Sequence, residues 1–330
     1  MGDIVDLMTK GIKESASKLM DLKEEEAPSI AILPFENKGA PEDAFYAYGI
    51  VADLISDVTG AGLIRVAGLK DVEKIDHSNL SYDEMSKILL VRYVAQGTLW
   101  KLGSMFQLSL EIFDTQLSKI IYTKRWQTQW EELTTIKDDL SSNILATLKI
   151  EVNNETKKTI NINPEAYEFY LKGKYSWEKT KSASETEIAI GLLEKAIELD
   201  DKLVAANRII GTIYWQSGDK KKMKKGRKIH FEALEKAKEI GNKEEVGEGL
   251  RMVGYYHADD KEYDKAYKLF EEAEEIAKEL NNKNLLGKTY NAFGNTKWRE
   301  EKLDEALDYF NRFLEISESI DEKWSMAAAM

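Results

Sequence analysis

The second half of the chain repeats one spacing of small and aromatic residues, and this pattern restricts the fold more than any other. Its clearest copies begin at Gly254 and Gly294. In each copy an alanine follows twelve residues later and a phenylalanine four residues after that. Small residues on both members of a helix pair let the two helices approach closely, and the ring fills the space beside the next pair. The spacing therefore predicts a stack of helical hairpins.

The same pattern extends to four hairpins. The small residues of their first helices are 38, 43 and 40 residues apart: Gly173, Gly211, Gly254 and Gly294. Their counterparts in the second helices are Ala189, Gly226, Ala266 and Ala306. The interval within a hairpin is 16 and 15 residues in the first two copies and 12 in the last two, which predicts longer loops in the early hairpins. We expect Ser184 and Glu187 to cap the second helix of the first hairpin.

These hairpins resemble tetratricopeptide repeats (TPR), although the proline that usually follows each repeat is missing and Asp201 replaces it after the first. The resemblance implies an all-α TPR superhelix over residues 161–330, with four repeats and the start of a further helix at residues 323–330. It also implies a protein that binds other proteins and has no catalytic residues.

Residues 28–150 follow a different pattern. Short apolar runs at residues 29–35 and 63–66 indicate buried strands, and a helix is predicted between them at 41–59. Ser81 and Glu84 have the spacing of a capping box and open a second helix at about 82–91. Three strands and a closing helix follow, at about 93–101, 106–112, 119–129 and 133–148. This order predicts a mixed-sheet α/β head domain, so the whole chain is expected to be α+β.

The motifs Ser29–Asn37, Tyr48–Ile50, Leu63–Val66 and Val91–Gly97 resemble the TolB amino-terminal-like domain. In that family the domain often lies between a signalling module, such as a class III adenylate cyclase or a DNA-binding domain, and C-terminal TPR repeats. The resemblance transfers no catalytic residues. Because only 28 residues precede the first predicted strand, we expect no cyclase domain in this chain.

The segments outside the two domains are short. Residues 1–27 space their apolar side chains as an amphipathic helix does, and we expect this helix to pack on the head or on a second copy, which makes a homodimer an option. Its polar side is not dominated by lysine and arginine, so a membrane-surface helix is disfavoured. Residues 151–160 are polar and are predicted to form a linker.

Composition excludes several classes of function. The net charge of −12 argues against a nucleic-acid partner that is bound through overall charge. The chain has no cysteine and only three histidines, which leaves little for a metal centre, a cofactor or a nucleophile. No apolar run approaches the roughly 20 residues that a membrane span needs. We expect a cytoplasmic protein with no cofactor and no membrane association.

The first helices of such hairpins line the concave side of the stack, so their inward faces are the candidate peptide-binding site. Counting from each glycine gives the candidates Tyr170, Lys174, Trp177, Arg208, Thr212, Trp215, Gln216, Arg251, Tyr255, Asp259, Asn291, Asn295, Trp298 and Arg299. Three tryptophans share the position four residues after the glycine. Tryptophan and arginine often dominate binding energies, whereas the alternative is that the indoles pack against neighbouring helices or the head.

The sequence therefore predicts a non-enzymatic scaffold that captures a partner peptide, and the arginines favour an acidic one. Two alternatives remain: a regulatory or sensory module whose head binds a small molecule or dimerises, and a self-association module. The segment Lys220–Lys228 holds seven basic residues in nine. It is predicted to be a solvated helix start or a docking patch for an acidic partner, since it lacks the aromatic residues that stack on nucleic-acid bases.

Overall fold

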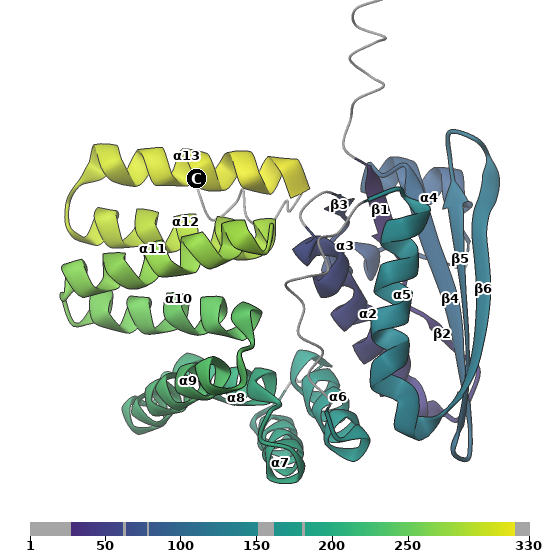
Figure 1. Cartoon of the computed structure of the whole chain (residues 1–330), viewed down its shortest axis with the longest axis horizontal. Coiled ribbons are helices and arrows are strands. Elements are labelled where there is room, and N and C mark those ends of the chain that lie inside the picture. Colours follow the sequence, from purple (N-terminus) through teal and green to yellow (C-terminus); the bar gives the residue numbers. More distant parts are fainter. Residues whose placement is uncertain (1–27, 62–63, 78, 151–161, 180–181, 321–330) are drawn as a thin grey trace, which may run out of the picture.

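The computed structural model describes residues 28–61, 64–77, 79–150, 162–179 and 182–320. The N-terminal helix, the linker and the partial C-terminal helix predicted above lie outside these residues. The described parts form a mixed α/β head followed by paired helices, which confirms the predicted fold class (Figure 1).

The head is built on one mixed sheet. Its strands are β1 (Ser29–Ile32), β2 (Glu36–Asn37), β3 (Arg65–Val66), β4 (Tyr93–Leu102), β5 (Met105–Asp114) and β6 (Lys119–Gln129). Their order is β3-β1-β4-β5-β6, with β2 paired to β4. The β1, β2 and β3 pairings are parallel, whereas β4, β5 and β6 form an antiparallel meander. Along β5 every second side chain is buried, as the alternation in its sequence predicts.

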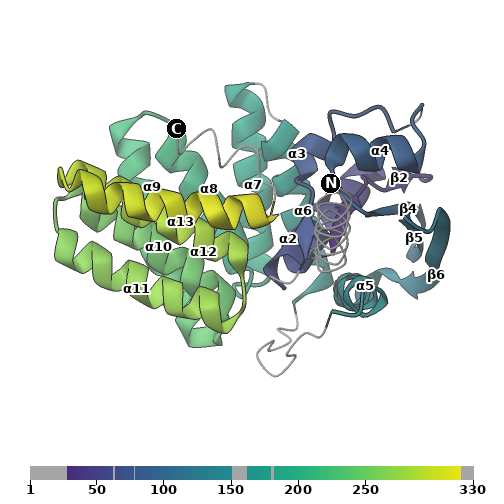
Figure 2. The same ribbon diagram turned by 90° about the horizontal axis from the view of Figure 1, so that it is seen from above.

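Helices cover both faces of this sheet. The head helices are η1 (Pro41–Asp43), α2 (Ala44–Gly60), α3 (Leu69–Val72), α4 (Tyr82–Leu89), η2 (Trp130–Glu132) and α5 (Leu133–Thr147). α2 and α5 bury one face and α3 and α4 the other, with the strands between α4 and α5 in Figure 2. The predicted capping box is present, because Ser81 and Glu84 each accept a hydrogen bond from the other's backbone N–H. The short elements β2 and α3 were not predicted.

The described residues from 162 onward form four antiparallel hairpins. They pair α6 (Pro164–Lys179) with α7 (Ala183–Leu199), α8 (Val204–Gln216) with α9 (Lys220–Ile240), α10 (Lys243–Asp259) with α11 (Tyr263–Glu279), and α12 (Lys283–Arg299) with α13 (Leu303–Ile320). The glycines sit where the pattern requires close approach. A Cβ atom on Gly294 would lie 2.6 Å from the Phe310 ring, for example, and one on Gly173 would lie 2.7 Å from Leu193.

Two predictions about the early hairpins are wrong. In all four hairpins three residues separate the two helices, so the early loops are not longer. Instead α7 and α9 begin about one turn earlier relative to their small residues, Ala189 and Gly226. For the same reason the cap of α7 is Ser182, whose hydroxyl accepts a hydrogen bond from the backbone N–H of Glu185, and not Ser184.

The head packs against the repeat array at both of its ends. Helix α2 contacts α6 in the first hairpin and α12 in the fourth, and lies between the array and the sheet in Figure 1. One buried cluster runs continuously from the head through the first two hairpins, from Ile30 and Leu54 to Leu193 and Tyr214. At the other end, Asn281 Nδ2 donates to the Ala61 carbonyl at 3.1 Å. The head therefore bridges the first and last hairpins.

Candidate functional site

The candidates from the first hairpin lie at the junction with the head. Lys174 Nζ is 2.7 Å from Asp53 Oδ1 in α2, and the Tyr167 hydroxyl donates to Asp53 Oδ2 at 2.7 Å. Burial alone raises the pKa of Asp53, but the charge of Lys174 outweighs it and brings this pKa below its ordinary value. Burial alone lowers the pKa of Lys174, and the Asp53 charge raises it above the usual range. Both groups are therefore charged at neutral pH.

Tyr170 and Trp177 also belong to this junction. Tyr170 is only 6% exposed and its ring stacks on Tyr167 with centroids 5.8 Å apart. Burial raises the pKa of Tyr170 to about 12. Trp177 is half-buried against the cluster that joins the head to the first hairpins. The structure thus places these two rings in packing contacts.

Candidates of the second hairpin connect it to the third. Arg208 forms a two-pronged ion pair with Glu245, with its Nε and Nη2 atoms 2.9 and 3.1 Å from the carboxylate oxygens. The Thr212 hydroxyl donates to the backbone carbonyl of Arg208 at 2.9 Å. The half-buried Trp215 presents its ring to Tyr256 of α10, with centroids 4.7 Å apart and planes at 67°. Gln216, next to it, is exposed.

The candidates on α10 and α12 form a polar row across these two helices. Arg251 pairs with Glu248 at 2.6 Å, and Arg299 pairs with Asp259. The remaining members bond to one another, because the Tyr255 hydroxyl donates to Asn291 Oδ1 at 3.4 Å and Asn295 Nδ2 donates to the same oxygen at 2.8 Å. We call the five candidates of this row the α10–α12 row: Arg251, Tyr255, Asn291, Asn295 and Arg299.

Each of the three candidate arginines therefore has a carboxylate partner within the array. The sequence reasoning named Asp259 but missed Glu245 and Glu248. Glu248 stands three residues before Arg251, a spacing at which helical side chains meet, so that pair was readable from the sequence. Burial alone raises the pKa of Glu248, but the charges of Lys288 and Arg251 hold it well below the usual range.

A further carboxylate, Glu244, lies in the first turn of α10, where the charge of Asp57 in α2 acts on it. Burial raises its pKa to about 7, and the charge of Asp57 in α2 acts in the same direction. The Asn282 amide is 3.5 Å from Glu244 Oε1. Nothing in the glycine spacing indicated this residue, since two of the groups that act on it, Asp57 and Asn282, come from α2 and from a loop about 40 residues away.

Trp298 differs from the other two indoles. It is 61% exposed, although it occupies the same position in its hairpin as Trp177 and Trp215. The three indoles are thus not equivalent in the structure, and only Trp298 offers most of its ring to a ligand.

The basic segment Lys220–Lys228 forms the first turns of α9. Asp219 caps this helix by accepting from the Lys222 backbone N–H at 2.8 Å. Several of its side chains have partners within the array, such as Lys225, whose Nζ is 2.9 Å from the Tyr214 hydroxyl. The structure therefore agrees with the helix start predicted for this segment.

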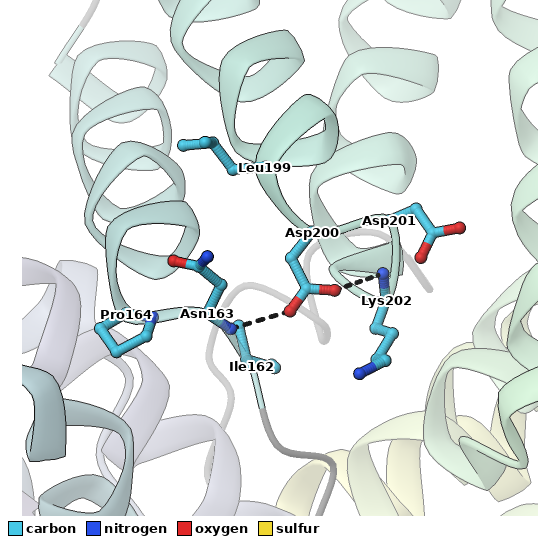
Figure 3. A pocket seen from close by; sticks show the side chains of 7 residues that line it. All are labelled: Ile162, Asn163, Pro164, Leu199, Asp200, Asp201 and Lys202. Atoms are coloured by element: carbon cyan, nitrogen blue, oxygen red, sulfur yellow. Dashed lines mark hydrogen bonds between the residues drawn. The ribbon is translucent and has the colours of Figure 1, made fainter.

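A pocket of about 550 Å³ opens where α6 begins and α7 ends (Figure 3). Its wall consists of Ile162, Asn163, Pro164, Leu199, Asp200, Asp201 and Lys202. Asp200 uses its carboxylate to accept from the backbone N–H groups of Asn163 and Lys202, at 2.8 and 3.0 Å. These bonds tie the start of α6 to the turn after α7, which is a structural role.

The described residues lack two kinds of feature. They contain no group of three or more histidine, aspartate or glutamate side chains placed to hold a metal ion. None of their helices combines the length and the apolar character that crossing a bilayer requires.

Residues 245–319 match the family model of the tetratricopeptide repeat, which confirms the predicted repeats in that part of the chain. Over 198 residues the chain is 24% identical to "Putative adenylate cyclase 3" of Rhizobium meliloti (strain 1021). This alignment covers 56% of the chain and 32% of the relative, so the chain spans about a third of that protein. The match confirms the predicted relation to adenylate cyclase-related proteins.

Solved structures show weaker likeness. TolB from Acinetobacter baumannii is 16% identical, covers 38% of this chain and 29% of its own, and has a TM-score of 0.31. MamA protein is 19% identical, covers 58% of this chain and 89% of its own, and has a TM-score of 0.33.

Proposed function

We propose that the chain is a non-enzymatic protein-interaction module that binds a partner peptide along the α10–α12 row. Tetratricopeptide repeats, which residues 245–319 match, indicate a module that binds proteins. One observation supports this location in particular. The row's hydrogen-bonding and ion-pair partners lie on α10 and α12 themselves, whereas the first-hairpin candidates Tyr170 and Lys174 are engaged at the head junction.

The proposed mechanism uses side chains that are already positioned. Asn291 Oδ1 accepts from Tyr255 and Asn295, which fixes the amide plane and leaves its Nδ2 group to donate to a peptide carbonyl. Little side-chain entropy is then lost on binding, because the row is ordered before the peptide arrives. Trp298 would supply apolar contact at the end of the row.

An acidic partner side chain would bind at Arg299. That guanidinium is 41% exposed and is neutralised by Asp259, so an incoming carboxylate would replace Asp259 rather than meet an unpaired cation. We therefore propose that acidic residues add selectivity at this point but supply only part of the affinity.

Peptide binding to paired variants tests the proposal. Peptides selected from a random library on the wild-type chain would be measured by fluorescence polarisation against Asn291→Ala/Asn295→Ala. The control is Asn311→Ala, an exposed asparagine on α13. We expect the double variant to lose about tenfold in affinity, as removal of one or two hydrogen bonds does, and the control to lose none. Equal binding by all three proteins would reject the row as the site.

The similarity to an adenylate cyclase-related protein favours a second candidate, a regulatory module of a signalling enzyme. In this reading the head binds a small molecule or a second copy, and the repeats follow its state through α2. A thermal-shift screen of nucleotides and metabolites, with light scattering for the dimer, tests it. No shift and a monomer would reject it. The cytoplasmic location stays a prediction.

A further inference from the structure

The head contacts the first and the last hairpin in different ways. At the first hairpin one buried apolar cluster runs from the head into α6 and α7, and a Cβ atom on Gly49 of α2 would lie 2.7 Å from Leu171 of α6. The ion pair of Asp53 and Lys174 belongs to the same contact. In the described residues, the buried apolar clusters of the third and fourth hairpins include no residue of the head. The apolar attachment of the head is therefore to the first hairpins.

The contact at the fourth hairpin is made through polar groups near the end of α2. Helix α2 contacts α12 there, and α13 contacts β3 (Figure 1). Asn281 Nδ2 donates to the Ala61 carbonyl at 3.1 Å, and a Cβ atom on Gly60 would lie 3.6 Å from Asn282 Nδ2. The same Asn282 amide lies 3.5 Å from Glu244 Oε1 of α10. We call this the end contact: the last turn of α2 with Ala61, against Asn281, Asn282 and Glu244.

A negative charge on Glu244 is unfavourable in the end contact. The carboxylate lies beside the C-terminal end of α2, where the free carbonyl groups of a helix give a partial negative charge, and the last turn of α2 holds Asp57 and no basic residue. Lys137 of α5 pairs with Asp57 at 3.1 Å and neutralises part of its charge. Burial is accordingly the larger cause of the raised pKa of Glu244, and the charge of Asp57 is the second.

The other charges near Glu244 belong to the array and stay with it when the head moves. The neighbouring carboxylates of α10 have cations of their own: Glu245 pairs with Arg208, and Glu248 with Arg251 and Lys288. Within the described ranges Glu244 itself has no ion-pair partner. Its place in the first turn of α10, which favours a negative charge, is also the same in both arrangements. Separation from the head therefore removes burial and the negative end of α2.

We propose that the end contact is a proton-dependent closure, which holds while Glu244 is protonated and opens when Glu244 ionises, while the first hairpin stays attached to the head. Opening would let the third and fourth hairpins move away from α2. Because the pKa of Glu244 in the closed form is raised to about 7, the closed form is favoured below neutral pH and is lost as the pH rises through 7. Neither form requires a bound peptide.

Distances between two spin labels test this directly. The chain has no cysteine, so labels can be attached at engineered cysteines alone. Lys87→Cys on α4 and Asn311→Cys on α13 are exposed positions and report the separation of the head from the fourth hairpin. Lys87→Cys with Ile188→Cys, on α7, is the matched pair for the first hairpin. Double electron–electron resonance would be recorded for both pairs at about pH 5.5 and about pH 8.5, on either side of the pKa of Glu244.

The expected change follows from the two pKa values of Glu244. A return from about 7 to the ordinary 4.5 on opening would change the opening equilibrium about 30-fold between these pH values. Glu245 and Glu248 remain beside Glu244, so we expect a change on the order of tenfold. The ratio of long to short distances in the Lys87–Asn311 pair should rise by this factor at the higher pH, whereas the Lys87–Ile188 pair should keep one distance.

Two variants identify the group responsible. Glu244→Gln keeps the shape of the side chain without its charge, so it should keep the short distance at both pH values. Glu272→Gln, at an exposed position of α11, should behave like wild type.

Three results would overturn the proposal. Wild-type distances that do not change with pH would mean that the end contact does not open. A Glu244→Gln chain that opens as wild type does, or is open at both pH values, would mean that another group controls the contact. A change in both label pairs would mean that the whole head separates from the array.

Discussion

Replacing Lys174 with methionine tests whether the head is docked on the repeats as the structure shows. The change leaves the Asp53 carboxylate, which is 9% exposed, with the Tyr167 hydroxyl as its hydrogen-bond donor. Removing one partner of a buried ion pair costs about 3–5 kcal/mol, and we expect a loss in this range because Asp53 loses its nearest cation and keeps only the weaker effect of the Lys137 charge. For a chain of this size, about 1 kcal/mol corresponds to roughly 2 °C in Tm, so we expect Lys174→Met to lower Tm by about 6–10 °C.

The double variant Asp53→Asn/Lys174→Met supplies the matched control. It removes both charges and keeps an acceptor for Tyr167, so its stability should return to within about 1.5 kcal/mol of wild type. Circular dichroism melts at pH 7 measure all three proteins, and hydrogen exchange in α2 and α6 locates the loss. A single variant that loses less than about 1 kcal/mol would match a solvent-exposed pair and would refute the docked arrangement.

Acid should remove the same contribution. The folded-state pKa of Asp53 is below its ordinary value of 3.8, so this group stabilises the fold above about pH 4 and the contribution is lost as the pH falls further. The difference in Tm between wild type and Lys174→Met is therefore expected to shrink below about pH 4. A difference that stays constant with pH would mean that the charge of Asp53 is not involved.

Three further variants test other parts of the structure. Gly294→Ala should cost about 1–3 kcal/mol in urea unfolding, because the new Cβ overlaps an aromatic ring, whereas Gly191→Ala, with open space beside it, should gain up to about 1 kcal/mol. The folded-state pKa of Glu244 is raised to about 7, so this group favours folding at acidic pH and the contribution is lost as the pH rises through 7. The Tm of Glu244→Gln minus the Tm of wild type should therefore increase between pH 5 and pH 8.5. A difference that stays constant would contradict this. Asp259→Asn frees Arg299 and should raise affinity for acidic peptides in a salt-sensitive way, and unchanged binding would remove Arg299 from the site.

Much of the fold could be predicted because its signals are local. The alternation in residues 106–112 marks β5, and the spacing of Ser81 and Glu84 marks the start of α4. The interval between Gly254 and Gly294 marks the hairpins, since close helix packing requires a small residue at each crossing. Each of these signals spans a few residues or repeats at a fixed period.

The parts that could not be predicted depend on contacts between distant segments. Asp53 and Lys174 are 121 residues apart. Neither the apolar spacing around Asp53 nor the glycine spacing around Lys174 indicates that the head covers the first hairpin. The glycine spacing located Trp298 and Trp215 at one position but could not tell whether a helix or solvent faces each ring. The early-loop prediction was wrong because an interval between two residues does not reveal how it divides between helix and loop.

The bridge made by the head has a consequence for the elasticity of the repeat array. A solenoid in which each hairpin touches only its neighbours changes its curvature at little cost. Here α2 contacts both the first and the last hairpin, and Asn281, just before α12, donates a hydrogen bond to the Ala61 carbonyl just after α2, so opening the arc would break contacts with the head. A ligand that widens or tightens the arc must therefore weaken or strengthen the contacts between α2 and the two end hairpins. By linkage, these contacts change the affinity for that ligand by the same factor by which the ligand changes the equilibrium of the contacts.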